Sequence, residues 1–498
     1  NATVQPGAYE MAHQQYEQAL EVQTMHTQTT ARTQAQSKSV ALDPGVMQAI
    51  NIIKSDAAKM LQERVSALLN INNKEAEIRL DPPEMGSMQI RIRSDAEQAQ
   101  INFVVQNQQA KDALEQNMPE LIALCIKEAG KVTQDSIDEV REAVDFLRYY
   151  AARAKELVTD ERLEARGVVL CISPWNFPLA IFIGQVAAAS VVGNTVIAKP
   201  AEQTSLIAKR AIEIMNDSGL PADVVQTVIA PGADVGSTLL PDSRISAVMF
   251  TGSTQTGSLI SQILAERGGE QVPLIAETGG QNCMIVDSTA LPEQVVDDVI
   301  SSGFQSAGQR CSALRVLFIQ EDVADGIIDM LKGALAELHI GDPSLLSTDV
   351  GPVIDEKALK TLNAHVEYLK GNATLHYECK IPDNSENGAF FFAPRLYEIK
   401  DLSVLKREVF GPCVHVIRFK SSELDTVLYQ SNNTGYGLTM GIPSRIEERC
   451  EHLAKMSRAG NVYINRNMIG AIVGVQPFGG RGLSGTGPKA GGPNYLQR

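Results

Sequence analysis

The clearest chemical candidate in the sequence is Cys311, which lies in the run GQRCS at residues 308–312. The run follows a predicted helix and precedes an apolar run over 316–319 that predicts a strand. A nearby cation or helix terminus lowers the pKa of a thiol and makes it a nucleophile. An unreactive buried cysteine is the alternative. None of the seven histidines is near Cys311 in the sequence, so a Cys–His pair is not supported.

A second candidate is Glu277, in the run LIAETGG at residues 274–280. It stands at the end of a predicted strand and before two glycines. Ligands of open α/β sheets bind at the carboxyl ends of strands. Desolvation there raises a carboxyl pKa toward the range that a general base needs. Glu277 is therefore a candidate base, and a solvated surface charge is the alternative.

Two further runs have groups suited to a dinucleotide. FTGSTQTG, at residues 250–257, follows a predicted strand and opens a helix, so Gly252 and Ser253 would lie where backbone N–H groups attract phosphate. The run does not match GxGxxG, and glycine turns before helices are common. Lys199 and Glu202 end another predicted strand, where they would contact ribose hydroxyls, and the Glu202 charge would repel a 2′-phosphate. A surface salt bridge is the alternative for this pair.

Composition excludes several classes of protein. The 498 residues include 59 acidic and 44 basic side chains, a formal net charge of −15, which argues against a nucleic-acid binder. The seven cysteines form no CxxC pair, so neither a disulfide framework nor a metal site is predicted, and a reducing, cytoplasmic location is expected. The first residues do not resemble a signal peptide. The apolar stretch 168–198 contains prolines and polar residues, which predicts two buried strands around a helix rather than a membrane span.

The elements that would position these groups alternate along the chain. A helix is predicted over 131–150, and helices near 204–218, 255–266 and 293–307 separate short apolar runs. Those runs, each predicting a buried strand, are residues 168–172, 195–199, 224–229, 247–250, 274–276 and 284–286. Strand–helix alternation predicts an α/β fold with a doubly wound parallel sheet.

The N-terminal part of the chain, before about residue 120, lacks this strand–helix alternation. Residues 1–45 are rich in Gln and Thr and are predicted to be disordered, and a helix is expected over 46–69. Period-two alternation over 88–93 and 101–105 predicts a pair of strands, followed by a helix from Gln108. With LDPPEMG at 80–86, this order resembles the C-terminal domain of flagellar hook-length control proteins over about residues 60–119. The resemblance implies a role in export switching and no catalysis; an unrelated small α+β module is the alternative.

Seven motifs in the remaining chain occur in a characteristic order: PWNF (174–177), KPAE (199–202), FTGS (250–253), ETGG (277–280), GQRC (308–311), EVFGP (408–412) and PFGG (477–480). Together they resemble the aldehyde dehydrogenase superfamily over about residues 121–498. EAVDFLRYY (142–150), CSALR (311–315) and GVQPFGG (474–480) are similar to L-glutamate γ-semialdehyde dehydrogenases, in particular the dehydrogenase domain of the bifunctional proline utilization A family.

The resemblance implies a role for each matching residue. Cys311 would attack the aldehyde, Asn176 and the Cys311 N–H would hold the oxyanion, and Glu277 would activate water to cleave the thioester. The residues implied in NAD binding are Ile172, Pro174, Trp175, Lys199, Glu202, Gly252, Ser253, Glu408 and Phe410. The residues implied in substrate binding are Phe177, Arg310, Ser312, Gly470, Ala471 and Phe478.

The expected organisation follows. A disordered segment (1–45) and a hook-control-like α+β module (46–119) precede an NAD-binding domain (120–277), a catalytic domain (278–460) and a return segment (461–498). The module replaces a segment that the family normally has before residue 121, and the seam falls within a helix, so a fusion is the simplest interpretation.

The expected function is oxidation of L-glutamate γ-semialdehyde to L-glutamate with NAD, in proline catabolism. The expected partner is a small-molecule aldehyde, with no nucleic acid or membrane involved, and homo-oligomerisation is left open. The alternative is a flagellar export-switching interaction protein fused to an inactive dehydrogenase fragment.

Overall fold

The computed structural model describes residues 75–80, 88–95, 98–105, 108–157, 164–381 and 389–498. The chain divides into two compact units, residues 1–112 and 113–498. The disorder predicted over 1–45 and the helix predicted over 46–69 lie outside the described residues.

The first unit contains a three-stranded antiparallel sheet in the order β1-β2-β3. Its strands are β1 (Glu75–Leu80), β2 (Met88–Asp95) and β3 (Gln98–Val105). The predicted strand pair is confirmed, and its register places Ile90 opposite Phe103 and Ile92 opposite Ile101. β1 was not predicted, although its sequence EAEIRL alternates with the same period of two.

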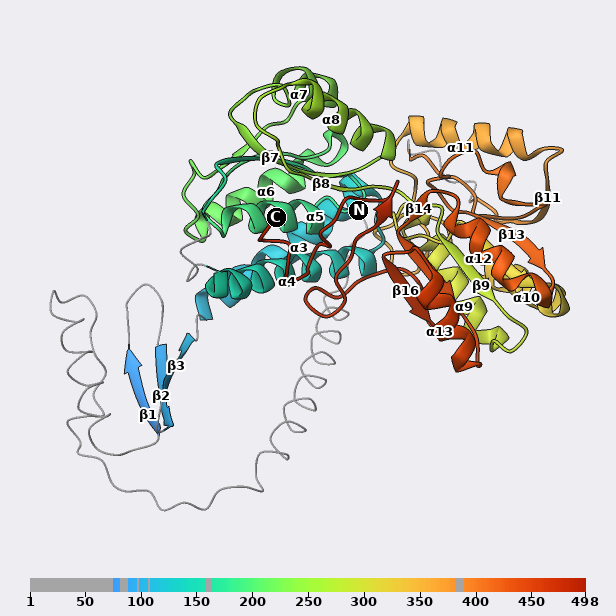
Figure 1. The fold of residues 1–498 in the computed structure, drawn as a ribbon, viewed down its shortest axis with the longest axis horizontal. Helices are drawn as coiled ribbons and strands as arrows, with labels where there is room; N and C mark the ends of the chain where they lie inside the picture. Colours follow the sequence, from blue (N-terminus) through green and yellow to red (C-terminus); the bar gives the residue numbers. More distant parts are fainter. Residues whose placement is uncertain (1–74, 81–87, 96–97, 106–107, 158–163, 382–388) are drawn as a thin grey trace, which may run out of the picture. The chain divides into compact units, whose positions relative to one another are not determined.

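The second unit begins with a five-stranded, wholly parallel sheet in the order β6-β5-β4-β7-β8 (Figure 1). Its strands are β4 (Val168–Ile172), β5 (Thr195–Lys199), β6 (Val225–Thr227), β7 (Ile245–Thr251) and β8 (Leu274–Glu277). Its helices are α4 (Thr133–Leu157), α5 (Ala180–Ser190), α6 (Ser205–Asp217), α7 (Gly232–Thr238) and α8 (Thr254–Glu266). The doubly wound sheet is thus confirmed, with every strand on a predicted apolar run. The stretch 168–198 is β4, α5 and most of β5, and no described helix is long and apolar enough to cross a membrane.

A second sheet has seven strands in the order β11-β12-β13-β10-β9-β15-β16, all parallel except the edge strand β11. Its strands are β9 (Cys283–Val286), β10 (Val316–Gln320), β11 (Ala373–Glu378), β12 (Arg395–Ile399), β13 (Cys413–Phe419), β15 (Thr439–Ile442) and β16 (Asn461–Ile464). The helices of this region are α9 (Pro292–Phe304), α10 (Glu321–Ala336), α11 (Glu356–Leu369), α12 (Leu424–Asn432) and α13 (Glu447–Met456). β14 (Tyr436–Gly437) and β17 (Arg481–Gly482) form a short separate pair. Strands β9 and β10 are fully buried because helices cover both faces of a parallel sheet.

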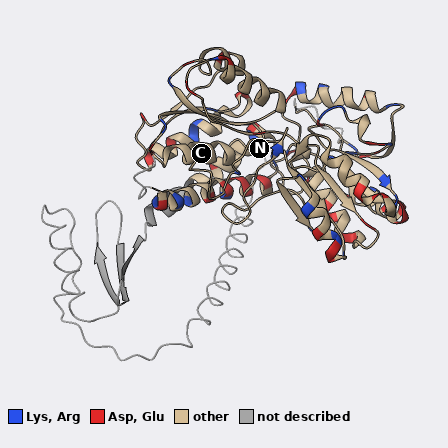
Figure 2. Ribbon diagram, viewed as in Figure 1, with Lys and Arg blue, Asp and Glu red and all other residues tan. Residues whose placement is uncertain are grey.

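Charges of both signs lie interspersed along the same helices of the second unit, as Figure 2 shows. The excess of acidic residues is therefore spread over the described surface, and a separate acidic cluster lines the cavity described below.

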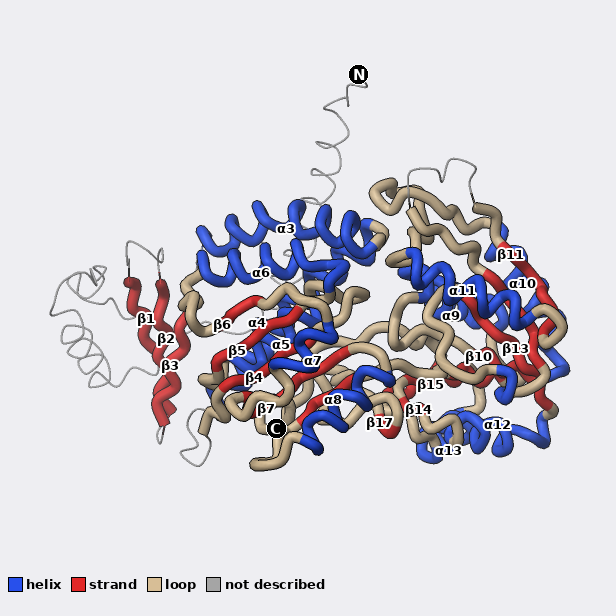
Figure 3. Tube along the Cα trace, turned by 90° about the horizontal axis from the view of Figure 1, so that it is seen from above, coloured by secondary structure: helices blue, strands red, loops and turns tan. Residues whose placement is uncertain are grey.

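The helix at the seam, α3 (Gln108–Ala129), continues through Pro119. From Asn117 onward it lies along α6 (Figure 3). Glu128 accepts hydrogen bonds from the backbone N–H groups of Leu206 (3.0 Å) and Ile207 (2.8 Å), two of the unpaired donors that begin α6. Glu120 pairs with Arg210 at 3.0 Å, while Leu121 and Cys125 are buried. The last two turns of the helix are thus part of the dehydrogenase-like unit.

We expect Glu128→Ala to lower the free energy of unfolding by about 0.5–2 kcal/mol, because it removes the side-chain cap of α6. Lys127→Ala, at the exposed neighbouring position, is the control and should leave stability within about 0.5 kcal/mol. Urea unfolding followed by circular dichroism measures both. Equal stability of the two variants would contradict the capping role.

Candidate active site

The loop that carries Cys311 has an unusual backbone. After α9 ends, Ser306 (φ 54°) and Ala307 (φ 53°) adopt the left-handed conformation although neither is glycine. Gly308 follows with φ 63°, and a Cβ there would lie 2.4 Å from the Gly411 carbonyl oxygen. The buried Arg315 side chain donates hydrogen bonds to the carbonyls of Gly308 (2.7 Å), Gly411 (3.1 Å) and Arg310 (3.0 Å). The Arg315 guanidinium therefore fixes the backbone of this loop and ties it to the chain at Gly411.

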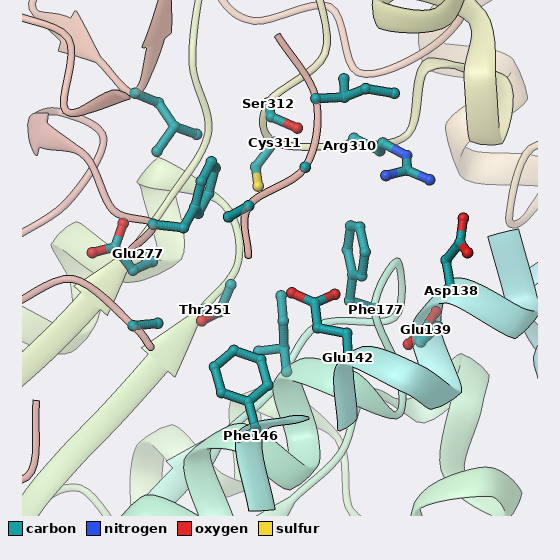
Figure 4. A pocket seen from close by; sticks show the side chains of 18 of the residues that line it. Asp138, Glu139, Glu142, Phe146, Phe177, Thr251, Glu277, Arg310, Cys311 and Ser312 are labelled. Atoms are coloured by element: carbon teal, nitrogen blue, oxygen red, sulfur yellow. The ribbon is translucent and has the colours of Figure 1, made fainter. Parts of the chain in front are cut away.

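A cavity of about 450 Å³ opens beside this loop and brings Cys311 and Glu277 together. All six residues that sequence analysis assigned to the substrate line it: Phe177, Arg310, Ser312, Gly470, Ala471 and Phe478. Figure 4 shows the Cys311 thiol pointing into the space, with Glu277 on one side and Phe177 and Glu142 across from it. Residues as far apart in the chain as Asp135 and Tyr495 thus line one chamber.

Cys311 is the only one of the seven cysteines that is not fully buried, and all seven are free thiols. Burial, and then the negative charges of Glu408 and Glu277, raise the pKa of its thiol to about 12. The thiol is therefore protonated at neutral pH, and attack on an electrophile requires loss of its proton.

Glu277 ends β8 and is buried. Its Oε2 accepts a hydrogen bond from the Gly480 N–H at 2.8 Å, whereas its Oε1 has no partner among the described residues. Burial raises the pKa of this carboxyl to about 8, against the opposing effects of the Gly480 N–H and of Lys489. A carboxyl with one uncommitted oxygen and a pKa near neutrality is suited to proton transfer.

Helix α4 contributes a row of acidic residues that sequence analysis did not assign to the site. Asp135, Asp138, Glu139 and Glu142 all line the cavity, at the helical spacing that places side chains on one face. Glu139 pairs with buried Lys131 at 2.5 Å and accepts hydrogen bonds from the N–H groups of Leu179 and Ala180, where α5 begins. Glu142 is half-buried, and burial followed by the charge of Glu139 raises its pKa to about 7. The acidic residues at positions i, i+3, i+4 and i+7 were the available sequence signal.

Asp135 connects α4 to the cysteine loop. Its buried carboxylate accepts hydrogen bonds from Gln305 Nε2 (2.5 Å), Ser306 Oγ (2.6 Å) and Arg310 Nη2 (3.0 Å). Arg310 also donates from Nε to Ser306 Oγ at 3.1 Å. Arg310 is thus engaged with its own loop and with Asp135, at the wall of the cavity.

The residues assigned to the cofactor lie outside the lining of this cavity. Ile172 ends β4 and Pro174-Trp175 follow it, Lys199 ends β5 with Glu202 beyond, and Gly252-Ser253 follow β7. Strands β5, β4 and β7 are neighbours, so these residues share one edge of the sheet. That edge is where the strand order reverses, the usual ligand position in such sheets.

Local contacts fix the positions of the residues assigned to the cofactor at this edge of the sheet. Glu202 Oε1 accepts hydrogen bonds from Lys199 Nζ (3.1 Å) and from the Gly232 N–H (2.8 Å). Ser253 caps α8, since its hydroxyl accepts the Thr256 N–H at 3.1 Å. Gly252 allows close approach at this turn, because a Cβ there would lie 2.6 Å from the Phe250 ring.

Glu408 and Phe410 are brought next to the same region by the Arg315 guanidinium. It lies 3.5 Å from Glu408 Oε1 and 5.2 Å from the Phe410 ring centre. Phe410 also contacts Trp175 edge-on, with ring centres 5.6 Å apart. A Cβ on Gly279 would fall 1.7 Å from Glu408 Oε2, so glycine at 279 is what admits this carboxylate.

Asn176 is not among the residues that line the cavity. Its side-chain amide donates one hydrogen bond to the Gln309 carbonyl at 3.0 Å, two residues before Cys311. An amide has a second N–H, so the oxyanion role of Asn176 stays a prediction.

Comparison with known proteins identifies the family. The aldehyde dehydrogenase family profile matches residues 106–498. The chain belongs to the aldehyde dehydrogenase family. The bifunctional protein PutA of Klebsiella aerogenes is 50% identical over 393 residues, 77% of this chain and 30% of that relative. The 1-pyrroline-5-carboxylate dehydrogenase of Geobacillus sp. (strain WCH70) is 37% identical over 394 residues, 76% of each chain.

Solved structures of aldehyde dehydrogenase relatives match the fold. A crystal structure of a bifunctional proline utilization A (PutA) protein superposes with a TM-score of 0.75 and 50% identity, over 78% of this chain and 41% of that one. The 1-pyrroline-5-carboxylate dehydrogenase from Thermus with bound NAD gives a TM-score of 0.74 at 32% identity, over 78% of each chain. The chain thus spans well under half of the PutA relatives.

A second family profile, that of the flagellar hook-length control protein FliK, matches residues 62–124. Both resemblances found in the sequence are therefore confirmed. The two matches share residues 106–124, which include α3 up to residue 124. The two profiles thus overlap over most of one helix, and the position of the seam between them stays a prediction.

We expect Asp135→Asn to destabilise the enzyme by about 3–5 kcal/mol, because it leaves the buried Arg310 guanidinium without its counter-ion. Asp138→Asn is the control. Asp138 lines the same cavity from the same helix, but among the described residues its carboxylate accepts a hydrogen bond only from the exposed Gln134 side chain. Calorimetric melting of both variants tests the expectation, and a shift for Asp135→Asn no larger than that for Asp138→Asn would contradict it.

Proposed function

We propose that the chain oxidises L-glutamate γ-semialdehyde, the open form of 1-pyrroline-5-carboxylate, to L-glutamate with NAD. The observation that carries this proposal is one cavity that contains a thiol, a carboxyl of raised pKa and a loop suited to bind a carboxylate. The relatives named 1-pyrroline-5-carboxylate dehydrogenase support the substrate class.

The chemistry begins at Cys311, whose sulfur adds to the aldehyde carbon as its proton passes to solvent. The developing oxyanion is held by the Cys311 N–H and by the free N–H of Asn176. After oxidation a thioester links the substrate to Cys311. Glu277 then accepts a proton from water through its uncommitted Oε1, and the hydroxide cleaves the thioester.

NAD, when bound, accepts the hydride. The residues present fit it: three adjacent strand ends, a helix N-terminus at Ser253 and a turn at Gly252 that leaves no side chain in the way. Lys199 and Glu202 would bind the adenosine ribose, and Glu408 with Phe410 the nicotinamide ribose. The Glu202 carboxylate would repel the 2′-phosphate of NADP, which favours NAD.

The opposite end of the cavity is suited to an amino acid. Tyr463 donates its hydroxyl proton to the Gly470 carbonyl at 2.8 Å, and in a trans peptide this turns the Ala471 N–H the other way. With the Ser312 hydroxyl, that N–H would anchor the substrate carboxylate. Phe177, flanked by Lys131 at 4.0 Å, and Phe478 would enclose the aliphatic part. Glu142 offers an acceptor for the α-ammonium group.

The division into an NAD-binding domain (120–277), a catalytic domain (278–460) and a return segment (461–498) belongs to the same proposal. The alternative, an interaction protein with an inactive enzyme fragment, is not favoured, because dehydrogenase relatives match about three quarters of the chain.

We expect the purified chain to form NADH from 1-pyrroline-5-carboxylate, and Cys311→Ala to form none. NAD affinity should stay within a few-fold in the variant, because the thiol contacts the substrate rather than the dinucleotide. Turnover by absorbance and NAD binding by calorimetry are measured on the same samples. Retained turnover in Cys311→Ala would overturn the assigned nucleophile.

Hydrolysis of the thioester should accelerate as the pH rises through about 8, because only the ionised Glu277 accepts a proton. In Glu277→Gln this pH step should vanish, and a burst of about one NADH per site should precede a slow steady state. Rapid-mixing kinetics between pH 6 and pH 9 measure both effects. A variant with neither a burst nor a slower steady state would exclude Glu277 as the base.

Removing the substrate's α-carboxylate should lower kcat/KM at least tenfold, since one charge-assisted hydrogen bond contributes about 1.5–3 kcal/mol. The comparison is between glutamate γ-semialdehyde and pentanal, first with the unmodified chain and then with Ser312→Ala. Ser312→Ala should reduce the preference and leave pentanal turnover nearly unchanged. Equal efficiency toward both aldehydes in the unmodified chain would rule out carboxylate recognition.

A further inference from the structure

Three potential metal ligands meet away from the cavity. His365 lies on α11, and Cys413 and His415 lie two residues apart on β13, so the latter two share one face of the strand. The two histidine Nε2 atoms are 2.9 Å apart, and the Cys413 Sγ lies 3.9 Å from His415 Nε2. All three donor atoms lie within 4.8 Å of one another. Sequence analysis predicted no metal site because the three residues form no compact motif.

The orientation of His415 is fixed by a backbone contact. Its Nδ1 lies 2.9 Å from the Arg315 carbonyl oxygen, an acceptor, so Nδ1 carries the proton and Nε2 presents a lone pair to the cluster. A ligating histidine typically donates its other N–H to a carbonyl or carboxylate in this way. Cys413 and His415 are fully buried, whereas His365 is half-buried and gives the cluster access to solvent.

The spacing is close to that of a bound ion. Zinc lies about 2.0–2.1 Å from histidine nitrogen and about 2.3 Å from thiolate sulfur, so tetrahedral ligands would stand about 3.3 Å (N to N) and 3.6 Å (N to S) apart. The observed 2.9 and 3.9 Å differ from these values by a few tenths of an ångström. The third pair, His365 Nε2 and Cys413 Sγ, lies within 4.8 Å, so closing the site needs a side-chain shift of at most about 1 Å and transfer of the His365 proton to its Nδ1.

The neighbouring charges are compatible with a cation. Arg315 and Arg395 face Cys413, and Arg407 faces His365. Two of these arginines have carboxylate partners: Arg315 lies 3.5 Å from Glu408, and Arg395 lies 2.8 Å from Glu378. The Cys413 thiolate would supply the negative charge that a divalent ion requires, and thiolate with imidazole is the donor set that zinc prefers.

We propose that His365, Cys413 and His415 bind one zinc ion per chain, with a fourth position open to water. Zinc binding at this site releases the Cys413 thiol proton to solvent, moves the His365 proton from Nε2 to Nδ1, and involves no redox step. The site is separate from the catalytic cavity, since none of its three residues lines that cavity.

The test uses the full chain carrying Cys311→Ala, which removes the one thiol that lines the cavity. Cobalt(II), the spectroscopic substitute for zinc, should give a thiolate charge-transfer band at one equivalent, and zinc should displace it. Cys413→Ser should abolish the band, and His365→Ala should weaken cobalt and zinc affinity at least tenfold. His376→Ala is the matched control, because His376 pairs with Glu398 on the same sheet and should leave affinity unchanged.

Thermal unfolding with and without zinc distinguishes loss of the metal site from loss of the fold. An ion that binds only the folded chain raises Tm. Zinc should raise the Tm of the Cys311→Ala chain and of its His376→Ala derivative, but not that of its His365→Ala derivative. His365 is half-buried on an outer helix, so its loss is expected to be tolerated even if Cys413→Ser does not fold. Absence of a thiolate band, a band that survives Cys413→Ser, or unchanged affinity in His365→Ala would overturn the proposal.

Discussion

The carboxylate of Asp135 is the interaction on which the geometry of the cysteine loop depends. Three donors from that loop converge on it, and two of them, Ser306 and Arg310, are buried. The left-handed Ser306 and Ala307 each cost about 1–3 kcal/mol, so they persist only where the surroundings over-determine them. Asp135 supplies that constraint by accepting hydrogen bonds from loop side chains, and Arg315 by donating hydrogen bonds to loop carbonyls. The loop that carries Cys311, the proposed nucleophile, is consequently positioned by α4 and by the residue that precedes β10.

Burial affects both the protonation of the groups in the cavity and the strength of their hydrogen bonds. It raises the pKa of both Cys311 and Glu277, which keeps the two groups neutral and lets them share a small chamber. The same exclusion of water strengthens every hydrogen bond to a developing charge. The acidic residues of α4 are committed to structural partners at Asp135 and Glu139, and Glu142 is left facing the cavity. Asp135 and Glu139 thus stabilise the structure around the cavity, whereas Glu277 and Glu142 are the carboxyl groups proposed to react or to bind substrate.

Much of this organisation was predictable from the sequence, because buried parallel strands are continuous apolar runs. All five strands of the first α/β sheet, and the strands that flank Cys311, were found in this way. The motifs located Cys311, Glu277 and Phe478, which line one cavity in the structure. The acidic face of α4 was missed, because charged residues on a helix ordinarily indicate a solvated face. The His365–Cys413–His415 cluster was also missed, since α11 and β13 meet only through the tertiary fold.

The pairing of Glu277 with the C-terminal segment has a consequence for biosynthesis. The N–H that holds the base belongs to Gly480, 203 residues later in the chain, and residues 484–486 bond to the end of β8 as well. At about 5–20 residues per second, a ribosome needs on the order of 10–40 s to travel between these points. The nascent chain therefore contains the five-stranded sheet, with Glu277 at the end of β8, long before it contains the N–H that holds the Glu277 carboxylate. A product truncated before Gly480 would contain Glu277 without the N–H that holds its carboxylate.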